Sequence, residues 1–228
     1  MIGIIGAMEI EVNQFKEQMT DKKTEKISNI EFVSGKLWGK STVVAVSGVG
    51  KVNAAICTQT MCLKYSPDFI INSGVAGGLE PTLKICDAVV AESVIQHDMD
   101  TSPLGDPVGF ISGLNIIEIP CSKELSQKLL SASRENDIRS LQGKIVSGDQ
   151  FINSSDKKDY LVKTFGAFAC EMEAAAIGHT AYQNNIPFCI LRSISDNADG
   201  SSHLSYTEFV DAASKNLKKI MYSFYSKL

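Results

Sequence analysis

The stretch ACEMEAAAIGHTAYQNNIPFCILRSISDNAD, residues 169–199, decides the fold that we predict for this chain. It begins as a short strand that ends at Cys170, and a helix opens after it, around Glu173. A second apolar strand, residues 187–194, delivers Asp196 to its carboxyl end. In an open parallel sheet, neighbouring strands finish at the same edge, and ligands bind in the crevice outside that edge. The spacing therefore predicts two carboxylates, Glu173 and Asp196, on either side of one small molecule.

Length and composition narrow the class of protein. The chain has 228 residues, 44% of them hydrophobic, without repeats or linkers, so we expect one α/β domain over residues 1–228. A net charge of −4 and the lack of a Lys/Arg block argue against a nucleic-acid partner. No apolar run reaches the ~18 residues of a membrane span, and the N-terminus lacks the cationic region of a signal peptide. Six scattered cysteines without a C-x-x-C pair favour reduced thiols and a cytoplasmic location.

Apolar runs and helical periodicity alternate along the chain, which is typical of an α/β fold. Besides the two strands of the opening stretch, the predicted strands are residues 1–5, 30–37, 41–47, 68–73, 87–95, 115–119 and 143–147. Besides the helix near Glu173, the predicted helices are residues 9–19, 52–65, 122–135, 155–165 and 204–227. Residues 96–113 form a loop, and a loop of this length inside a compact domain is usually functional or lies in an interface.

Three short motifs have ordinary structural explanations as well as functional ones. SGVGK, residues 47–51, is not a phosphate-binding P-loop, because Ala45 and Val52 occupy the positions of its first glycine and its Ser/Thr. GVAGG, residues 74–78, forms either a plain turn or a backbone that closely approaches a ligand. His97 and the aspartates that follow it match no standard ligand spacing, so we predict no metal site.

Two further features also allow two interpretations. Glu9 and Glu11 lie at the first turn of a predicted helix, where the helix dipole favours acids that have no other role. Phe151 follows a strand in a polar loop, so it is either a stacking platform for a ligand or part of the core. The residues alone do not choose between these interpretations.

Six motifs in order carry a resemblance to one family. They are GIIGAMEIE (residues 3–11), SGVGKVNAA (47–55), NSGVAGG (72–78), VSGDQFI (146–152), EMEA (171–174) and RSISD (192–196). Together they resemble the bacterial 5′-methylthioadenosine/S-adenosylhomocysteine nucleosidases, members of the purine nucleoside phosphorylase superfamily. The resemblance runs nearly from end to end of the chain.

This resemblance implies a single-domain, three-layer α/β/α sandwich around a mixed, partly barrelled sheet, and a homodimer. It implies hydrolysis of the bond between adenine and the ribosyl sugar of small adenine nucleosides, without a cofactor. By motif position, Asp196 matches the general acid at adenine N7, Glu11 the activator of the attacking water, and Glu173 the acid that binds the ribose hydroxyls. Acids suit this reaction, because cleavage leaves positive charge on the sugar and negative charge on the departing base.

Other residues match substrate-binding positions of the family. Phe151 matches the ring that stacks on adenine, and Ile152 the residue whose backbone contacts the edge of the base. In the loop of residues 98–110, Thr101 and Leu104 match residues that reach the 5′-substituent pocket of the partner subunit. The alternative is an exposed surface loop without this role. The remaining matched positions are Met8, Val49, Val75, Ala76, Gly77, Met172, Arg192, Ser195 and Tyr206.

Two departures and three rival functions accompany this prediction. Val75 stands where the family often has Ser, and Ile10 replaces the middle residue of an acidic triplet. A nucleoside phosphorylase needs a cationic phosphate site, whereas the chain offers Glu9 and Glu11 after its first strand. A hydrolase for futalosine would differ mainly at the 5′ end of the substrate. A non-catalytic purine-binding protein would have little need of three acids.

Overall fold

A computed structural model describes the backbone of residues 1–200 and 205–228, and the side chains of residues 1–200, 209 and 212–228. Its strands are β1 (Ile2–Gly6), β2 (Met19–Ile27), β3 (Ile30–Leu37), β4 (Lys40–Val46), β5 (Phe69–Gly78), β6 (Ala88–Gln96), β7 (Ile119–Pro120), β8 (Ser140–Ser147), β9 (Ala167–Glu171) and β10 (Phe188–Asp196). Its helices are α1 (Glu9–Gln18), α2 (Lys51–Tyr65), α3 (Lys123–Glu135), α4 (Ser155–Phe165), α5 (Ala174–Gln183) and α6 (Ser205–Tyr225), with a short 3-10 helix, η1 (Ser102–Leu104).

The strands form one mixed sheet, part of which is closed. β10, β6, β8, β9 and β5 pair in that order, and β10 pairs back onto β5, so these five strands make a barrel. From β5 the sheet continues outward through β1, β4, β3 and β2. The pairs along β1, β4 and β5 are parallel, whereas β2, β3 and β4 form antiparallel pairs.

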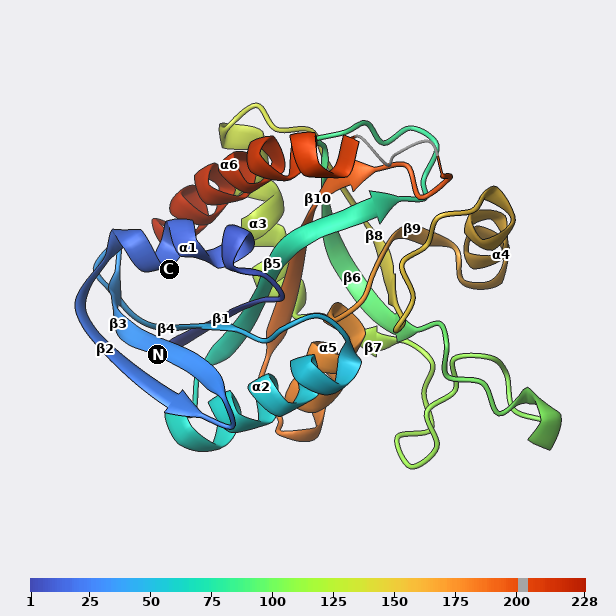
Figure 1. Ribbon diagram of the computed structural model, residues 1–228, viewed down its shortest axis with the longest axis horizontal. Coiled ribbons are helices and arrows are strands. Elements are labelled where there is room, and N and C mark those ends of the chain that lie inside the picture. The colour runs from blue at the N-terminus through green and yellow to red at the C-terminus, as the bar shows by residue number, and fades with distance from the viewer. Residues whose placement is uncertain (201–204) are drawn as a thin grey trace.

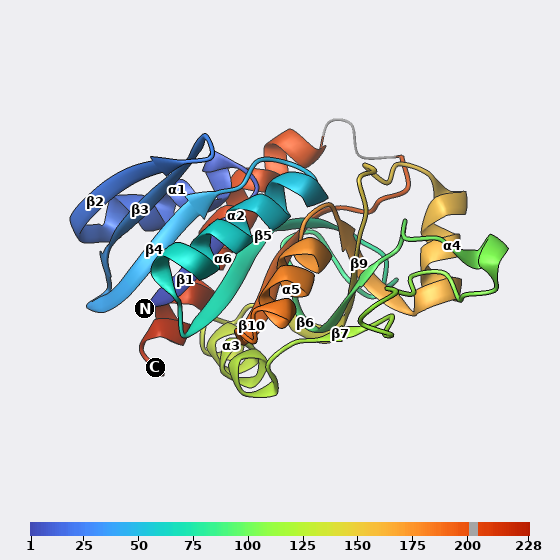
Figure 2. The same ribbon diagram turned by 90° about the horizontal axis from the view of Figure 1, so that it is seen from below.

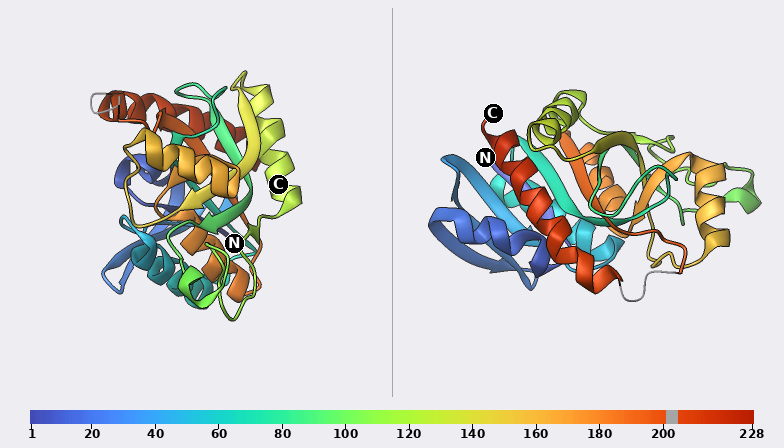
Figure 3. Two further views of the ribbon diagram at one scale, coloured as in Figure 1. Left: turned by 90° about the vertical axis from the view of Figure 1, so that its right-hand side faces the viewer. Right: turned by 90° about the horizontal axis from the view of Figure 1, so that it is seen from above.

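Helices cover both faces of the sheet. α1, α3 and α6 lie on one face, and α2 and α5 lie side by side on the other (Figures 1 and 2). Figure 3 shows α6 running along the first face and α4 at the far end of the molecule. Each layer buries its own core, with Phe15 and Leu217 on the side of α1 and α6, and Met61 and Ile177 on the side of α2 and α5. The predicted α/β/α sandwich around a mixed, partly barrelled sheet is confirmed.

The central strands are buried over their whole length. All nine residues of β10, FCILRSISD, are buried, because helices and other strands cover both sides of it. A strand in this position reads as a continuous apolar run rather than an alternating pattern. Its polar residues Arg192, Ser195 and Asp196 therefore enter the interior of the protein with it.

Three elements differ from their predictions. β2 has no predicted counterpart, because most of its side chains are exposed and its mostly charged and polar sequence lacks an apolar face. The GVAGG segment continues β5 as strand through Gly78, so it is not a turn. Of the strand predicted over residues 115–119, only Ile119 lies in a strand, because Asn115 adopts a positive φ of 58° and makes a turn.

β9 and β10 also meet in a different way from the open parallel sheet that we predicted. They are not neighbours but lie on opposite sides of β5, with β9 antiparallel and β10 parallel to it. Gly77 of β5 pairs with Cys170 on one side and with Asp196 on the other. The ends of β9 and β10 therefore lie on either side of Gly77, because both strands pair with β5 in the closed barrel.

Candidate active site

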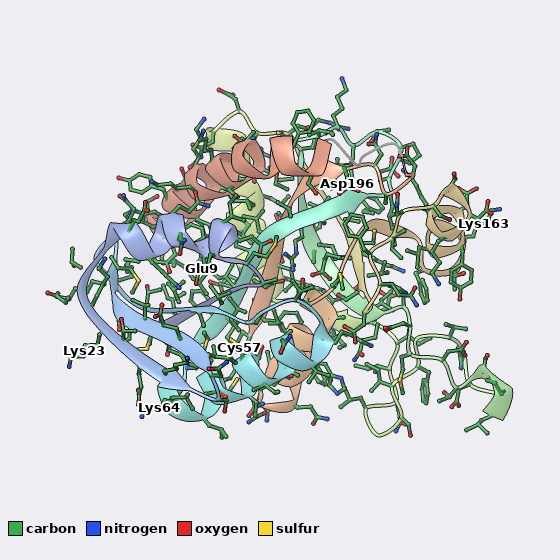
Figure 4. All side chains as sticks on the ribbon, in the orientation of Figure 1. Glu9, Lys23, Cys57, Lys64, Lys163 and Asp196 are labelled. Atoms are coloured by element: carbon green, nitrogen blue, oxygen red, sulfur yellow. The ribbon has the colours of Figure 1, made fainter. Side chains whose placement is uncertain are left out.

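A pocket opens where β5, β9 and β10 end, next to the turns that follow β1 and β4. Figure 4 shows Asp196 at the end of β10, close to the end of β5. Twelve of the sixteen lining residues belong to the predicted site: Met8, Glu11, Val49, Val75, Ala76, Gly77, Phe151, Ile152, Met172, Glu173, Ser195 and Asp196. Glu171, from the same motif as Glu173, also lines the pocket. The other three are Ala7, Gln150 and Cys170.

Asp196 is held at the end of its strand by two donors. Ser195 Oγ donates to Asp196 Oδ2 (2.9 Å), and the Ala198 N–H donates to Oδ1 (2.9 Å). The side chain is buried but borders the pocket. A Cβ atom added to Gly77 would lie 3.1 Å from Asp196 Oδ1, so glycine at this position leaves room for the carboxyl group.

Glu11 points from the first turn of α1 into the interior rather than into solvent. Its Oε2 accepts from the N–H groups of Ala7 (2.7 Å) and Met8 (3.1 Å), and its Oε1 accepts from the Val75 N–H (3.0 Å). Burial raises the pKa of Glu11, although Arg192 and these three N–H groups act in the opposite direction. Glu11 is therefore not an acid on a solvated face that interacts only with the helix dipole. Glu9, in contrast, is exposed.

Val75 takes part in the site through its backbone. Its N–H holds Glu11, and its side chain packs against Met8 and Ala213 in a small apolar cluster. The bond to Glu11 needs no hydroxyl group at position 75. The departure from Ser at this position therefore leaves the fixation of Glu11 intact.

Glu173 lies at the start of α5 and reaches across to the turn before α2. The Gly50 N–H donates to Glu173 Oε1 (2.8 Å). Burial raises the pKa of Glu173 to about 7, and the negative charge of Glu171 adds to the rise. Arg192 and the Gly50 N–H oppose it. Near neutral pH this carboxyl group can therefore gain or lose a proton.

Arg192 lies beneath the pocket among three carboxyl groups and is fully buried. Its Nη2 contacts Glu171 Oε2 and lies 4.0 Å from Glu173 Oε2, while its Nη1 lies 3.8 Å from Glu11 Oε1. Nη2 also donates to Asn72 Oδ1 (2.5 Å). Our sequence analysis assigned no role to Glu171 or Asn72. The sequence signal was present, since Glu171 opens the EMEA motif and Asn72 opens NSGVAGG.

The mouth of the pocket is apolar. Phe151 is 59% exposed and Val49 is 50% exposed, and both line the pocket. Exposed aromatic and aliphatic side chains beside an open pocket are suited to cover a flat ligand. Of the two interpretations of Phe151, the structure favours a position at the pocket over one in the core.

Some predicted site residues lie away from this pocket. Thr101 and Leu104 belong to the loop with η1, which projects from the body of the molecule (Figure 1), and Leu104 is 84% exposed. Neither residue lines the pocket of its own chain. Tyr206 lies outside the residues whose side chains are described.

Comparisons with known proteins agree with this geometry. Residues 1–226 match the family model described as the phosphorylase superfamily. A 5′-methylthioadenosine/S-adenosylhomocysteine nucleosidase from an Exiguobacterium species is 42% identical over 226 residues, which cover 96% of this chain and 95% of that protein. The chain belongs to this nucleosidase family.

Solved structures within the superfamily have the same fold. The Neisseria meningitidis nucleosidase of this family, solved in complex with methylthio-immucillin-A, superposes with a TM-score of 0.96 at 35% identity, covering 100% of this chain and 99% of that one. A futalosine hydrolase of Helicobacter pylori superposes with a TM-score of 0.95 at 36% identity, covering 100% and 97%. The resemblance to the nucleosidase family that the six motifs predict is confirmed.

The site combines buried acids with an apolar mouth. Asp196 lies on the β10 side of the pocket, and Glu11 and Glu173 approach it from α1 and α5. Within the described part of the chain, no group of three or more His, Cys, Asp or Glu residues is placed to hold a metal ion. None of the described helices has the length and apolar character needed to cross a membrane. The arrangement therefore places buried carboxyl groups from three distant parts of the chain around one pocket.

Proposed function

We propose that this protein hydrolyses the N-glycosidic bond of 5′-methylthioadenosine and S-adenosylhomocysteine, releasing adenine and the 5′-thioribose product. The convergence of Asp196, Glu11 and Glu173 on one pocket carries the proposal, because these acids come from distant parts of the chain. The 42% identical Exiguobacterium nucleosidase supports the substrate class. 5′-Deoxyadenosine, which has the same base and sugar, is a further candidate substrate. The reaction needs no cofactor, since water and side-chain acids supply every group that is transferred.

In the proposed mechanism, Asp196 donates a proton to adenine N7 while the bond between N9 and C1′ of the sugar breaks. The electron pair of that bond leaves with the base, and C1′ becomes cationic. Glu11 accepts a proton from water as the water oxygen bonds to C1′. Glu173 binds the ribose hydroxyls, and its negative charge stabilises the cation. Proton transfer by a positioned acid or base typically contributes about 10²–10⁴-fold each.

The remaining pocket residues orient the substrate in this proposal. Phe151 stacks on the adenine ring, the backbone of Ile152 contacts the edge of the base, and Ser195 holds Asp196. Around the ribose and the 5′ group we place the pocket residues Met8, Val49, Val75, Ala76, Gly77 and Met172. The resemblance adds Tyr206, whose side chain lies outside the described residues.

Asp196→Asn tests the role of the general acid. Asn keeps an oxygen for the Ala198 N–H but has no proton to donate to N7, and Ser195 Oγ can accept from its amide group. We expect kcat for adenine release from methylthioadenosine to fall by about 10²–10⁴-fold, with substrate binding and the melting temperature retained. Adenine release at the wild-type rate would contradict the assignment of Asp196.

A phosphorylase reaction fits the pocket less well. Phosphate would have to approach Glu11 and Glu173, and the nearby cation, Arg192, is already in contact with Glu171. Adenine release should therefore proceed without phosphate and should yield no ribose-1-phosphate. A requirement for phosphate would overturn the hydrolytic mechanism.

A second candidate function is the hydrolysis of futalosine. The observation in its favour is that the futalosine hydrolase of Helicobacter pylori superposes on the whole of this chain. The two activities share the acids and differ in the group at the 5′ end. Measuring the release of the base from futalosine and from methylthioadenosine at equal concentrations separates them. We expect methylthioadenosine to have the higher kcat/KM.

We also propose that residues 1–228 form one domain and that the active form is a cytoplasmic homodimer. One continuous sheet supports a single domain. Contact with a second copy is supported by three exposed apolar residues of α2, which are Val52, Ile56 and Leu63. The projecting loop with Thr101 and Leu104 would then reach the 5′-substituent pocket of the partner.

A further inference from the structure

Glu171 is a pocket acid to which the proposed reaction assigns no task. Its carboxylate already has donors on both oxygens. Ser147 Oγ donates to Oε1, while the N–H groups of Glu173 (2.9 Å) and Ala174 (2.8 Å) and Nη2 of Arg192 donate to Oε2. Ser147 Oγ in turn accepts from the Ala175 N–H (2.7 Å). Glu171 is therefore committed to the protein and is not available to bind a sugar hydroxyl.

The acidic groups around Glu173 outnumber the basic ones. The charged groups that face it are Glu171 from β9, Arg192 from β10 and Glu11 from α1, and Asp196 lies in the same pocket. All of them are buried, so water does little to screen their interactions. Arg192 contacts Glu171, but it stands 4.0 Å from Glu173 and 3.8 Å from Glu11. One cation is thus shared by three acids, and Glu171 has the closest contact.

We infer that Glu171 is a positioning residue: it engages Arg192 and places a negative charge beside Glu173, so that the ionised form of Glu173 is less favoured than it would be without Glu171. This role rests on the proposed function, because it concerns the acid assigned to the ribose. Glu171 acts through Arg192 and through its own negative charge, without touching the substrate. This effect of Glu171 has the same direction as the raised pKa of Glu173. Burial is the largest cause of that rise, and the negative charge of Glu171 is the next.

The consequence lies in the pH dependence of the reaction. Only ionised Glu173 both accepts bonds from the ribose hydroxyls and stabilises the cation. Activity should therefore rise with pH as Glu173 loses its proton, through about pH 7 in the free enzyme. Without the negative charge of Glu171, the positive charge of Arg192 is no longer offset and favours ionised Glu173 more strongly, so the rise should occur at lower pH.

Glu171→Gln tests the charge while retaining the shape. The amide oxygen still accepts from Arg192 and from the two N–H groups, and the amide nitrogen donates to Ser147 Oγ, whose hydrogen can rotate. We expect the acidic limb of kcat/KM to move to lower pH by about one unit. A midpoint that stays at the wild-type pH would overturn the inference, even if the rate falls.

Two matched variants separate charge from structure. Glu171→Asp keeps the charge but shortens the side chain, so its rate should fall while the midpoint stays in place. Glu124→Gln removes an acid with a 77% exposed side chain on α3, and it should change neither the rate nor the midpoint. A shift in Glu171→Asp as large as that in Glu171→Gln would mean that geometry, and not charge, sets the midpoint.

A direct titration makes the inference independent of the assay. Glutamate labelled with ¹³C at the carboxyl carbon reports the protonation of each Glu by NMR, and Glu173→Gln identifies the signal of residue 173. We expect the Glu173 midpoint to fall in Glu171→Gln. If the wild type releases no adenine but this midpoint still falls, the proposed function fails and the coupling stands. An unchanged midpoint in an active enzyme refutes the coupling alone.

Discussion

At the scale of the residue, the site depends on how closely backbone and charged side chains approach. Gly74 of β5 lies where Arg192 and Glu11 meet. A Cβ atom at this position would lie 2.0 Å from Arg192 Nη1 and 2.4 Å from Glu11 Oε1. The absence of a side chain at residue 74 is thus a condition for the close approach of Arg192 and Glu11.

Gly74→Ala should disturb this contact without removing any polar group. The methyl group must displace Arg192 or Glu11, and overpacking of this kind costs about 1–3 kcal/mol of stability. Misplacing a reacting group by about 1 Å can cost about 10²-fold, so we expect a loss of that order in kcat/KM. Kinetics and thermal unfolding measured on the same preparation check both effects. Wild-type activity in Gly74→Ala would contradict the described packing.

At the scale of the element, the start of α2 is fastened to the loop after β8. Asp149 Oδ1 accepts from the Lys51 N–H (2.7 Å), and the Asp149 N–H donates to Asp98 Oδ2 (2.9 Å). Lys51 Nζ completes the connection with Asp98 Oδ1 (2.6 Å). Gly50, one residue earlier, is the donor to Glu173. The connection therefore helps to fix a backbone group that orients a site acid.

Asp149→Ala removes the acceptor at the first N–H of α2. We expect a loss of about 1 kcal/mol in the free energy of unfolding, as for an N-cap. We also expect a higher KM, because the Gly50 N–H is held less firmly against Glu173. Chemical denaturation and steady-state kinetics measure the two quantities.

Ser122→Ala is the matched control for Asp149→Ala. Ser122 caps α3, where its side chain accepts from the Leu125 N–H (3.4 Å), and it does not line the pocket. This variant should lose similar stability with an unchanged KM. Equal KM values in both variants would separate the α2 connection from substrate binding.

At the scale of the whole molecule, the site of one chain is expected to be completed by another. The loop with η1 projects from the body, and Thr101 Oγ1 donates to Asp106 Oδ2 (2.8 Å) within it (Figure 1). An exposed leucine on a projecting loop is consistent with a surface that a partner covers. The proposed homodimer thus assigns a place to a segment that lies outside its own pocket.

Mixing two variants, each expected to have low activity for a different reason, tests this exchange. Asp196→Asn has a defective pocket and an intact loop, whereas Leu104→Asp has an intact pocket and a defective loop. If loops are exchanged in a two-fold dimer, about a quarter of the sites in a mixture that exchanges subunits become fully intact. We therefore expect adenine release to recover after mixing.

The control for the mixing experiment pairs two pocket defects, Asp196→Asn and Glu11→Gln. Every pocket then carries one defect in any combination of chains, so mixing should restore nothing. Activity in Leu104→Asp alone that equals the wild-type value would contradict a role for the loop. Recovery in the control mixture would indicate contamination with active enzyme.

Much of the local structure could be predicted because it follows from periodicity. β3 over Ile30–Leu37 and α4 over Ser155–Phe165 have the predicted bounds. Their apolar spacing lies within the segments, and their capping and turn residues lie directly beside them. β2 could not be predicted in this way, because a largely exposed strand whose side chains are mostly charged or polar gains its order from pairing with β3.

The sequence by itself determined the family and the candidate site residues, since acids, glycines and an aromatic residue stand in six motifs in a fixed order. Only the tertiary structure decided how they act together. β5 lies between β9 and β10, and the closed barrel brings Glu171 against Arg192. The physical reason is that charge and protonation depend on burial and on neighbours distant in the chain. Spacing along the sequence contains neither quantity, so the coupling of Glu171 to Glu173 emerges only from the fold.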